Sequence, residues 1–311
     1  MDKEKIAVFL SLDRAFLIPA TVTIFSLLKN NPKQCFRIYL VAEEFGVDWI
    51  SPLVSLIEKM GSEPILKPIN GRAISKLKVN PQLSHATYYR VLAPSLFQES
   101  KIIYLDSDLL VHGDISELWE LDLEDFPIAA VEDPFTRDLH RLGLTEDQGY
   151  FNSGVLLMNL DQWRKMNLGD LVLDFAFNNP AIIPYLDQCS LNAVLKGNWL
   201  RLEPKWNLQT GMVEKEPSGF FNRFFSEQSL LEANQNPRII HFTGAFKPWK
   251  PGCKHPFKNL FWEYLNQIPN EIKSPIDFSW FRIKSWIPLS LNKFYWKLFK
   301  ERKSMLLSGT S

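Results

Sequence analysis

The sequence predicts an α/β protein built on a mostly parallel sheet. Short apolar runs of strand composition alternate with runs of helical length and periodicity, which is the pattern of consecutive β-α-β units. The chain has 311 residues, of which 46% are hydrophobic and 23% are charged, values that are ordinary for a globular enzyme. It contains no uninterrupted apolar run of about 18 residues, so we expect no membrane-spanning helix.

The elements are expected in a regular order. The first segment, MDKEKIAVFLSLD, predicts a strand and not a signal peptide, because its apolar part is brief and no small-residue cleavage site follows. In the first half, strands are predicted at 6–12, 36–42, 63–69, 101–106 and 127–132, with helices at 17–30 and 47–61. In the second half we predict a strand at 150–160, a helical region at 160–179, a short helix at 187–197 and a strand at 238–242.

Composition and missing motifs exclude several classes of function. The formal net charge is zero, so the chain as a whole lacks the basic signature of a nucleic-acid-binding protein. Neither G-x-G-x-x-G nor G-x-x-x-x-G-K-[ST] occurs, which argues against a dinucleotide fold and a P-loop. Cys35, Cys189 and Cys253 are scattered, which argues against a disulfide framework and a cysteine zinc site and fits a reducing compartment.

Two aspartates follow the apolar run KIIYL. Asp106 and Asp108 lie two residues apart, so on an extended chain they point the same way at the carboxyl end of a predicted strand. Open α/β sheets bind ligands at that end, and two neighbouring carboxylates reduce their repulsion by sharing Mg²⁺ or Mn²⁺. The alternative is a turn in which both carboxylates are solvated.

A third candidate ligand comes from the segment HFTGAFKPW. His241 ends the apolar strand RIIHF, and one nitrogen added to two carboxylates shifts the preference from Mg²⁺ towards Mn²⁺. Gly244 would allow close backbone approach to a phosphate, and Lys247 could meet a diphosphate as a point charge. A structural histidine is the alternative.

Six segments in order carry a resemblance to a known family. They are the first strand with Asp13, HATYYR with Arg90, YLDSD, YFNSGVLLMNL, LDQCSLN and HFTGAFKPW, spread over residues 5 to 265. Together they resemble family 8 retaining glycosyltransferases, particularly bacterial lipooligosaccharide α-galactosyltransferases and α-glucosyltransferases, and more distantly glycogenin. The resemblance implies a nucleotide-sugar-binding domain of the GT-A type. The chain departs from the family pattern at Arg14, Ala15 and Phe16, where relatives often carry an acid or Asn and then Tyr.

The resemblance also implies roles for individual residues. By it, Asp106, Asp108 and His241 are the Mn²⁺ ligands. Asp13 meets the uracil, and Ser107, Gly244 and Lys247 contact the rest of the nucleotide. Arg90, Asn152, Asp187 and Gln188 line the donor sugar.

Simpler structural roles remain open for three of these residues. Asp187 could be a helix N-cap, Arg90 a structural ion pair and Asn152 a satisfied core amide. Gln188 is a poor nucleophile whose amide can only orient or stabilise. We therefore favour departure and attack on the same face of the sugar over a covalent intermediate.

The last 38 residues have a different composition from the rest. Residues 274–311 carry seven Lys and Arg against Asp277 and Glu301, a charge of +5, together with eight aromatic residues, which leaves residues 1–273 at −5. This mixture suits an anionic membrane surface, although it would also suit a nucleic acid or a packed helix with a basic face. We predict a catalytic domain over 1–273 and a membrane-association segment over 274–311.

The sequence thus predicts a cytoplasmic enzyme held at the inner face of the cell membrane. It would move galactose or glucose from UDP-galactose or UDP-glucose to an oligosaccharide or lipid-linked glycan of lipopolysaccharide or capsule, with Mn²⁺ or Mg²⁺ as cofactor and no nucleic acid. The alternatives are a nucleotidyltransferase, which would need a glycine-rich loop near LSLDRAF, and a non-catalytic sugar-nucleotide or glycan-binding protein, which would be expected to lose the Asp-Asp-His set.

Overall fold

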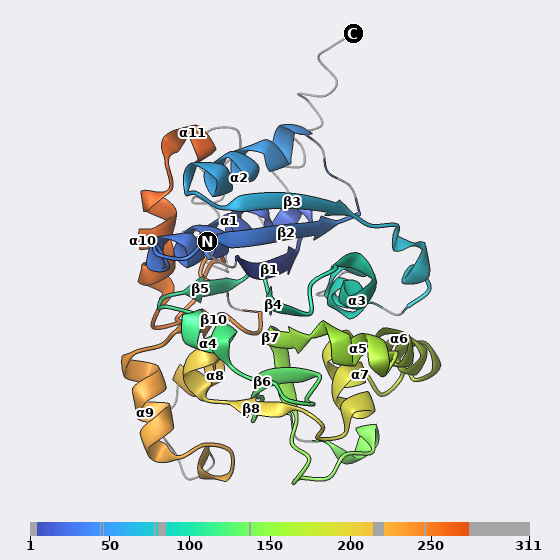
Figure 1. Ribbon diagram of the computed structural model, residues 1–311. Coiled ribbons are helices and arrows are strands. Elements are labelled where there is room, and N and C mark those ends of the chain that lie inside the picture. The colour runs from blue at the N-terminus through green and yellow to red at the C-terminus, as the bar shows by residue number, and fades with distance from the viewer. Residues whose placement is uncertain are drawn as a thin grey trace, which may run out of the picture.

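A seven-stranded sheet forms the centre of the protein, in the order β3-β2-β1-β4-β7-β6-β8 (Figure 1). The computed structural model describes residues 5–273 except 44, 46, 78, 80–84, 137, 214–220 and 246. The strands are β1 Ile6–Ser11, β2 Phe36–Ala42, β3 Glu63–Pro68, β4 Lys101–Leu105, β6 Ile128–Glu132, β7 Phe151–Asn159 and β8 Leu200–Leu202. Only β7 runs antiparallel to its two neighbours, so the predicted mostly parallel α/β sheet is confirmed.

The inner strands of this sheet are buried on both faces. Along β1, Ile6, Val8 and Leu10 belong to one hydrophobic core, whereas Ala7 and Phe9 belong to the other. A strand covered on both faces needs apolar side chains at every position, which is why IAVFLS reads as a continuous apolar run.

Helices cover the two faces. On one side lie α1 Leu17–Asn30, α2 Val47–Lys59, α10 Lys258–Gln267 and α11 Asn270–Lys273; α10 and α11 pack against α1 and α2, so the end of the described chain returns to its beginning (Figure 1). The remaining helices are α3 Ala93–Leu96, α4 Ser116–Glu120, α5 Leu160–Lys165, α6 Leu168–Asn178, α7 Leu186–Leu195, α8 Thr210–Val213 and α9 Glu227–Gln235. The 3-10 helix His85–Leu92 packs with α6 and α7.

A second, smaller sheet lies beside the first (Figure 1). It consists of β5 Leu109–Val111, β10 Ile239–His241 and β9 Leu208–Gln209, in that order. On the side of β5 away from β10, side chains of α1 meet its backbone: Thr23 Oγ1 donates to Leu109 O at 2.8 Å, and Val111 N donates to Ser26 Oγ at 3.0 Å. Buried helix hydroxyls therefore stabilise this edge in place of another strand.

The predicted elements correspond closely to those observed, with two differences. The predicted helical region 160–179 is two helices, α5 and α6, separated at Asn167, which has a positive φ of 50°. The sequence reading also missed the strands β5, β8 and β9 and the helices α3, α4, α8, α9, α10 and α11. Among residues that the structure describes, no helix combines the length and hydropathy needed to cross a bilayer.

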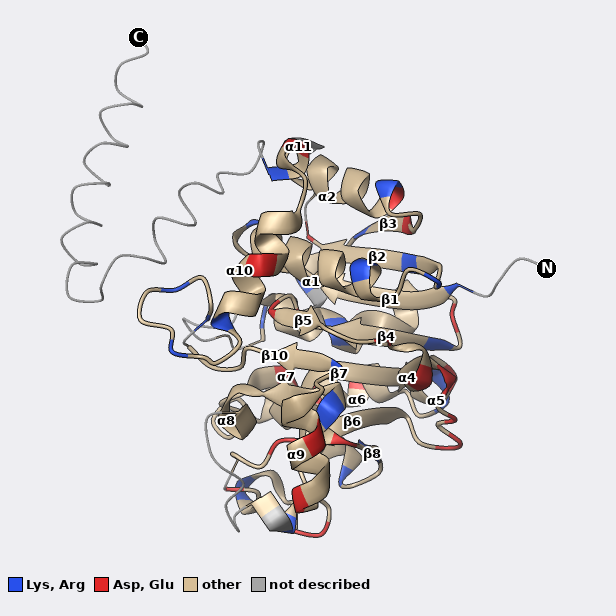
Figure 2. Ribbon diagram, turned by 90° about the vertical axis from the view of Figure 1, so that its left-hand side faces the viewer, with Lys and Arg blue, Asp and Glu red and all other residues tan. Residues whose placement is uncertain are grey.

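Figure 2 shows Lys, Arg, Asp and Glu distributed along many elements of the ribbon. The segment 274–311 lies outside the described residues, so the predicted division at residue 273 stays a prediction.

Candidate active site

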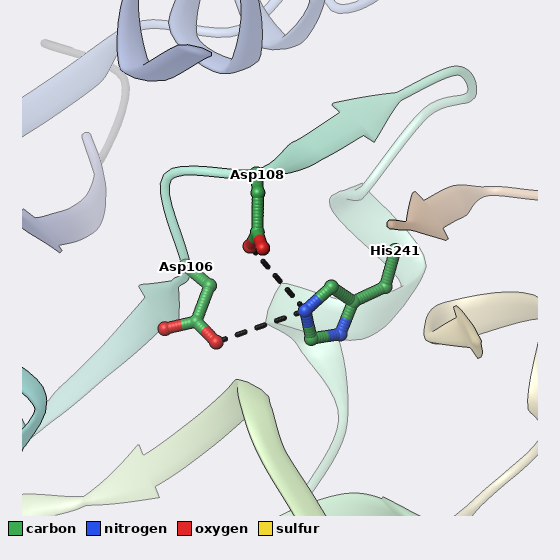
Figure 3. Close-up of side chains that lie close together, drawn as sticks. All are labelled: Asp106, Asp108 and His241. Atoms are coloured by element: carbon green, nitrogen blue, oxygen red, sulfur yellow. Dashed lines mark ion pairs between the residues drawn. The ribbon is translucent and has the colours of Figure 1, made fainter. Parts of the chain in front are cut away.

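Asp106, Asp108 and His241 converge where the two sheets meet (Figure 3). Asp106 directly follows β4, Asp108 directly precedes β5, and His241 is the last residue of β10. His241 Nε2 lies 3.4 Å from Asp108 Oδ1 and 3.7 Å from Asp106 Oδ2, and one potential ligand atom from each residue lies within 4.8 Å of the others. The apolar run KIIYL therefore ends in two aspartates because the chain leaves one sheet there and enters the other.

The carboxylate of Asp106 is held from one side. Its Oδ1 accepts hydrogen bonds from the Arg90 guanidinium at 2.9 Å and from the Tyr104 hydroxyl at 2.6 Å. The guanidinium also lies 4.2 Å from the centre of the Tyr104 ring, a cation–π distance. These contacts leave Asp106 Oδ2 directed towards His241.

The two carboxylate oxygens of Asp108 also have different partners. Its Oδ2 accepts from the ammonium of Lys247, which also donates to Phe242 O, while Oδ1 faces His241. Burial would raise the pKa of Asp108, but the Lys247 ammonium and the neighbouring His241 outweigh it and hold that pKa below its ordinary value. Asp108 is therefore a carboxylate at neutral pH.

The geometry and donor set fit a divalent cation. Two carboxylate oxygens and an imidazole nitrogen are ligands that such ions accept, and His241 Nδ1 is held by Asn207 Oδ1 at 2.9 Å. The neighbouring β7 has Gly154 at this point, where a Cβ atom would lie 2.2 Å from His241 Cε1 and 2.7 Å from Asp106 Oδ2. Only glycine leaves room there for the cluster as it stands.

Four further predicted residues form a buried polar layer beside the cluster. Arg90 Nε lies 3.0 Å from Asp187 Oδ2, Asn152 Nδ2 donates to Gln188 Oε1 at 3.2 Å, and all four side chains are buried. Arg90 thus makes ion pairs with both Asp106 and Asp187, and Asp187 is not the N-cap of α7, because Tyr185 holds that position. Burial raises the pKa of Asp187 to about 6, although the Arg90 charge opposes the shift.

The predicted nucleotide contacts are more dispersed. Asp13 caps the 3-10 helix Arg14–Phe16, accepting from Ala15 N at 2.9 Å and Phe16 N at 3.1 Å. The Ser107 hydroxyl donates to Ser11 O at 2.9 Å, which ties the Asp-Ser-Asp loop to the end of β1. Gly244 is exposed, with φ at +78°, a conformation that favours glycine.

Three residues of the site were missed by the sequence reading: Tyr104, Asn207 and Asp133, whose Oδ2 accepts from Gln188 Nε2 at 3.0 Å. Tyr104 could have been found, because it lies two residues before Asp106 and so shares its direction along the chain. Asp133 directly follows the strand IAAVE, the same signal that singled out Asp106. Asn207, in KWNLQ, carries no such signal.

The chain is similar in sequence to known bacterial proteins. It is 36% identical over 202 residues to General stress protein A of Bacillus subtilis, covering 62% of this chain and 69% of that protein. It is 28% identical over 275 residues to Lipopolysaccharide 1,2-glucosyltransferase of Escherichia coli, covering 85% and 79%. Some relatives are longer: the chain spans 63% of GlyF and 35% of GlyA of Streptococcus pneumoniae.

A solved structure shares the fold. The galactosyltransferase LgtC, in complex with donor and acceptor sugar analogues, superposes with a TM-score of 0.77 at 21% identity, over 87% of this chain and all of LgtC. This likeness confirms the predicted GT-A fold. The family model for glycosyl transferase family 8 matches residues 7–253, and the chain therefore belongs to glycosyl transferase family 8.

Proposed function

We propose that this family 8 glycosyltransferase moves galactose or glucose from a UDP-sugar to a glycan acceptor, with retention of configuration and with Mn²⁺ as its cation. The observation that carries the proposal is the Asp106–Asp108–His241 cluster at the junction of the two sheets. The carboxyl ends of parallel strands are where such sheets bind ligands, and β1 and β4 both end beside this cluster.

Each group of residues has a proposed task. A divalent cation bound by the cluster would neutralise negative charge on the leaving diphosphate. Lys247 exchanges its contact with Asp108 for one with the diphosphate, which Gly244 also approaches. Asp13 and Ser107 lie on the side of the nucleoside. Arg90 fixes the carboxylates of Asp106 and Asp187 relative to each other.

The donor hexose is proposed to contact Asn152, Asp187 and Gln188. Asp187 Oδ2 already forms an ion pair with Arg90 and accepts from Ser153 Oγ at 3.2 Å, which suits orientation of the sugar better than covalent attack on it. We therefore favour the same-face route. In it, the bond from the anomeric carbon to the phosphate oxygen breaks, the acceptor oxygen bonds to that carbon, and the acceptor proton passes to the departing diphosphate.

The proposed acceptor is a glycan of lipopolysaccharide or capsule at the cytoplasmic membrane face. It is supported by the similarity to the E. coli protein named lipopolysaccharide 1,2-glucosyltransferase and by the basic, aromatic composition of residues 274–311.

A hydrolysis screen tests the proposal without knowledge of the acceptor. The full chain is incubated with UDP-galactose, UDP-glucose and other nucleotide sugars, with Mn²⁺ and with a chelator, and release of UDP is measured. We expect Mn²⁺-dependent release from one of the two UDP-hexoses. Release from no nucleotide sugar, accompanied by sugar binding without UDP, would favour a glycan-binding protein instead.

A further inference from the structure

An unbroken chain of side-chain hydrogen bonds connects His241 to Asp133. His241 Nδ1 meets Asn207 Oδ1 at 2.9 Å, and Asn207 Nδ2 donates to Asn152 Oδ1 at 2.9 Å. Asn152 Nδ2 donates to Gln188 Oε1 at 3.2 Å, and Gln188 Nε2 donates to Asp133 Oδ2 at 3.0 Å. The chain therefore runs from the proposed cation ligand through three amides to a carboxylate.

Backbone groups of β7 fix the direction of this chain. Gly154 N donates to Asn152 Oδ1 at 3.0 Å, and Ser153 N donates to Gln188 Oε1 at 3.1 Å. A backbone N–H can only donate, so the atoms that face these two groups must be the oxygens of the amides. If the oxygen and nitrogen of the Asn152 or Gln188 amide were exchanged, its NH₂ group would face a backbone N–H, and two donors would meet.

The fixed direction determines which nitrogen of His241 carries a proton. Because Asn152 presents its oxygen, Asn207 must present its NH₂ group to it and its own oxygen to His241. An oxygen opposite Nδ1 requires that Nδ1 carry a hydrogen, and the lone pair of the neutral ring is then on Nε2. Nε2 is the atom that faces Asp106 and Asp108.

We propose that Asn207 is a positioning residue that holds His241 in the Nδ1–H tautomer, with its Nε2 lone pair directed at a divalent cation. Asn207 is fully buried, and both ends of its amide are used in this chain. The inference rests on the proposed metal site. It also connects that site to the proposed sugar pocket, since Asn152 and Gln188 belong to both the hydrogen-bond chain and the pocket.

The tautomer can be observed directly. In the ¹⁵N-labelled full-length protein, long-range ¹H–¹⁵N spectra report which ring nitrogen of each histidine is protonated, and a His241→Gln variant assigns the signal. We expect His241 Nδ1 to carry a proton throughout the neutral pH range, with and without a diamagnetic divalent cation such as Mg²⁺ or Zn²⁺. A neutral His241 protonated on Nε2 alone would overturn the proposal.

Variants separate positioning from general stability. Asn207→Ala should lose the fixed Nδ1 proton and weaken binding of Mn²⁺ alone by about 10- to 100-fold, measured by calorimetry. Asn207→Asp keeps an acceptor for Nδ1 but loses the donor to Asn152 Oδ1, and it should retain the Nδ1 proton. As a control, Asn31→Ala removes another buried amide that donates to Leu27 O and accepts from Ile115 N, and should leave the His241 signal unchanged.

These readouts involve no UDP-sugar and are independent of turnover. Loss of UDP-sugar hydrolysis alone would contradict the proposed function and leave this inference intact. Equal Mn²⁺ affinity in Asn207→Ala and the intact protein, with the Nδ1 proton retained, would show that Asn207 only fills space.

Discussion

The two aspartates of the cluster each give one oxygen to a cationic side chain and keep the other for the common centre. Asp106 Oδ1 is held by Arg90, and Asp108 Oδ2 by Lys247. Asp106 Oδ2, Asp108 Oδ1 and His241 Nε2 then face one another. The paired cations offset the repulsion between two neighbouring carboxylates, so the centre persists in a largely buried setting.

Lys247 provides a test at the scale of single residues. Removal of its ammonium in Lys247→Ala should weaken the binding of UDP by about 1.5–3 kcal/mol, because a hydrogen bond from a charged group to the diphosphate is lost. Uridine, which has no phosphate, should bind as before. Calorimetry with both ligands checks this, with Lys250→Ala, exposed in the same loop, as control. Equal losses for UDP and uridine would place Lys247 away from the diphosphate.

Asp187 gives a second residue-scale test, in the pH dependence of stability. Burial raises its pKa to about 6, whereas an aspartate in an unfolded chain has a pKa of about 4. The folded protein therefore binds this proton more tightly than the unfolded chain does. The stability of the wild type relative to Asp187→Asn should fall as pH rises from about 4 to about 6. Denaturant unfolding at several pH values measures the difference, and a difference that stays flat or rises would contradict the assignment.

At the scale of elements, the sequence predicted those helices and strands whose own residues show a clear pattern. The segments 36–42 and 17–30 correspond to β2 and α1, because one is a continuous apolar run and the other has full helical length. β5, β8 and β9 contain two or three residues each, too few to show a period. β5 is held by pairing with β10 and by Thr23 and Ser26 of α1, contacts that span more than 80 residues of sequence.

In the candidate site, too, some residues could be predicted from local sequence and others could not. The ligands Asp106 and Asp108 could be predicted from a strand that ends in D-x-D, and His241 from its place after another strand. Asn207 could not be predicted, since its role depends on the small sheet that brings β9 beside β10. In that pairing His241 lies opposite Gln209, and Asn207, two residues earlier in the chain, reaches His241 Nδ1 with its side-chain oxygen at 2.9 Å.

Strand β7 supplies a test at this scale. Gly154→Ala would place a methyl group 2.2 Å from His241 Cε1 and 2.7 Å from Asp106 Oδ2, so the cluster must open. We expect a marked loss of affinity for Mn²⁺ alone and some loss of stability. Gly143→Ala is the control, because a Cβ there meets nothing within 4 Å, although its φ of +69° also costs stability. Undiminished Mn²⁺ affinity in Gly154→Ala would mean that the ion binds elsewhere.

For the whole molecule, the distribution of charge predicts how it meets a membrane. Residues 274–311 carry +5 against −5 for the rest. Each Lys or Arg near an anionic surface contributes about 1 kcal/mol, screened over about 8–10 Å by salt. The full chain should co-sediment with anionic vesicles at low salt and be released as salt rises.

A truncation after residue 273 separates the two parts of this prediction. It should stay off the vesicles yet still hydrolyse the UDP-sugar, losing only activity on a membrane-bound acceptor. If the truncated protein bound vesicles as well as the full chain, the membrane contact would lie within residues 1–273, and residues 274–311 would have no role in it.

The central claim is that Asp106, Asp108 and His241 hold the cation through which UDP binds. Calorimetric titration of UDP, with Mn²⁺ and with a chelator, tests it most directly in the full chain and in Asp108→Ala, with the exposed Asp161→Ala as control. The wild type and the control should bind UDP far more tightly with Mn²⁺. Asp108→Ala should bind UDP weakly and equally under both conditions, whereas intact Mn²⁺-dependent binding in that variant would contradict the assignment of the site.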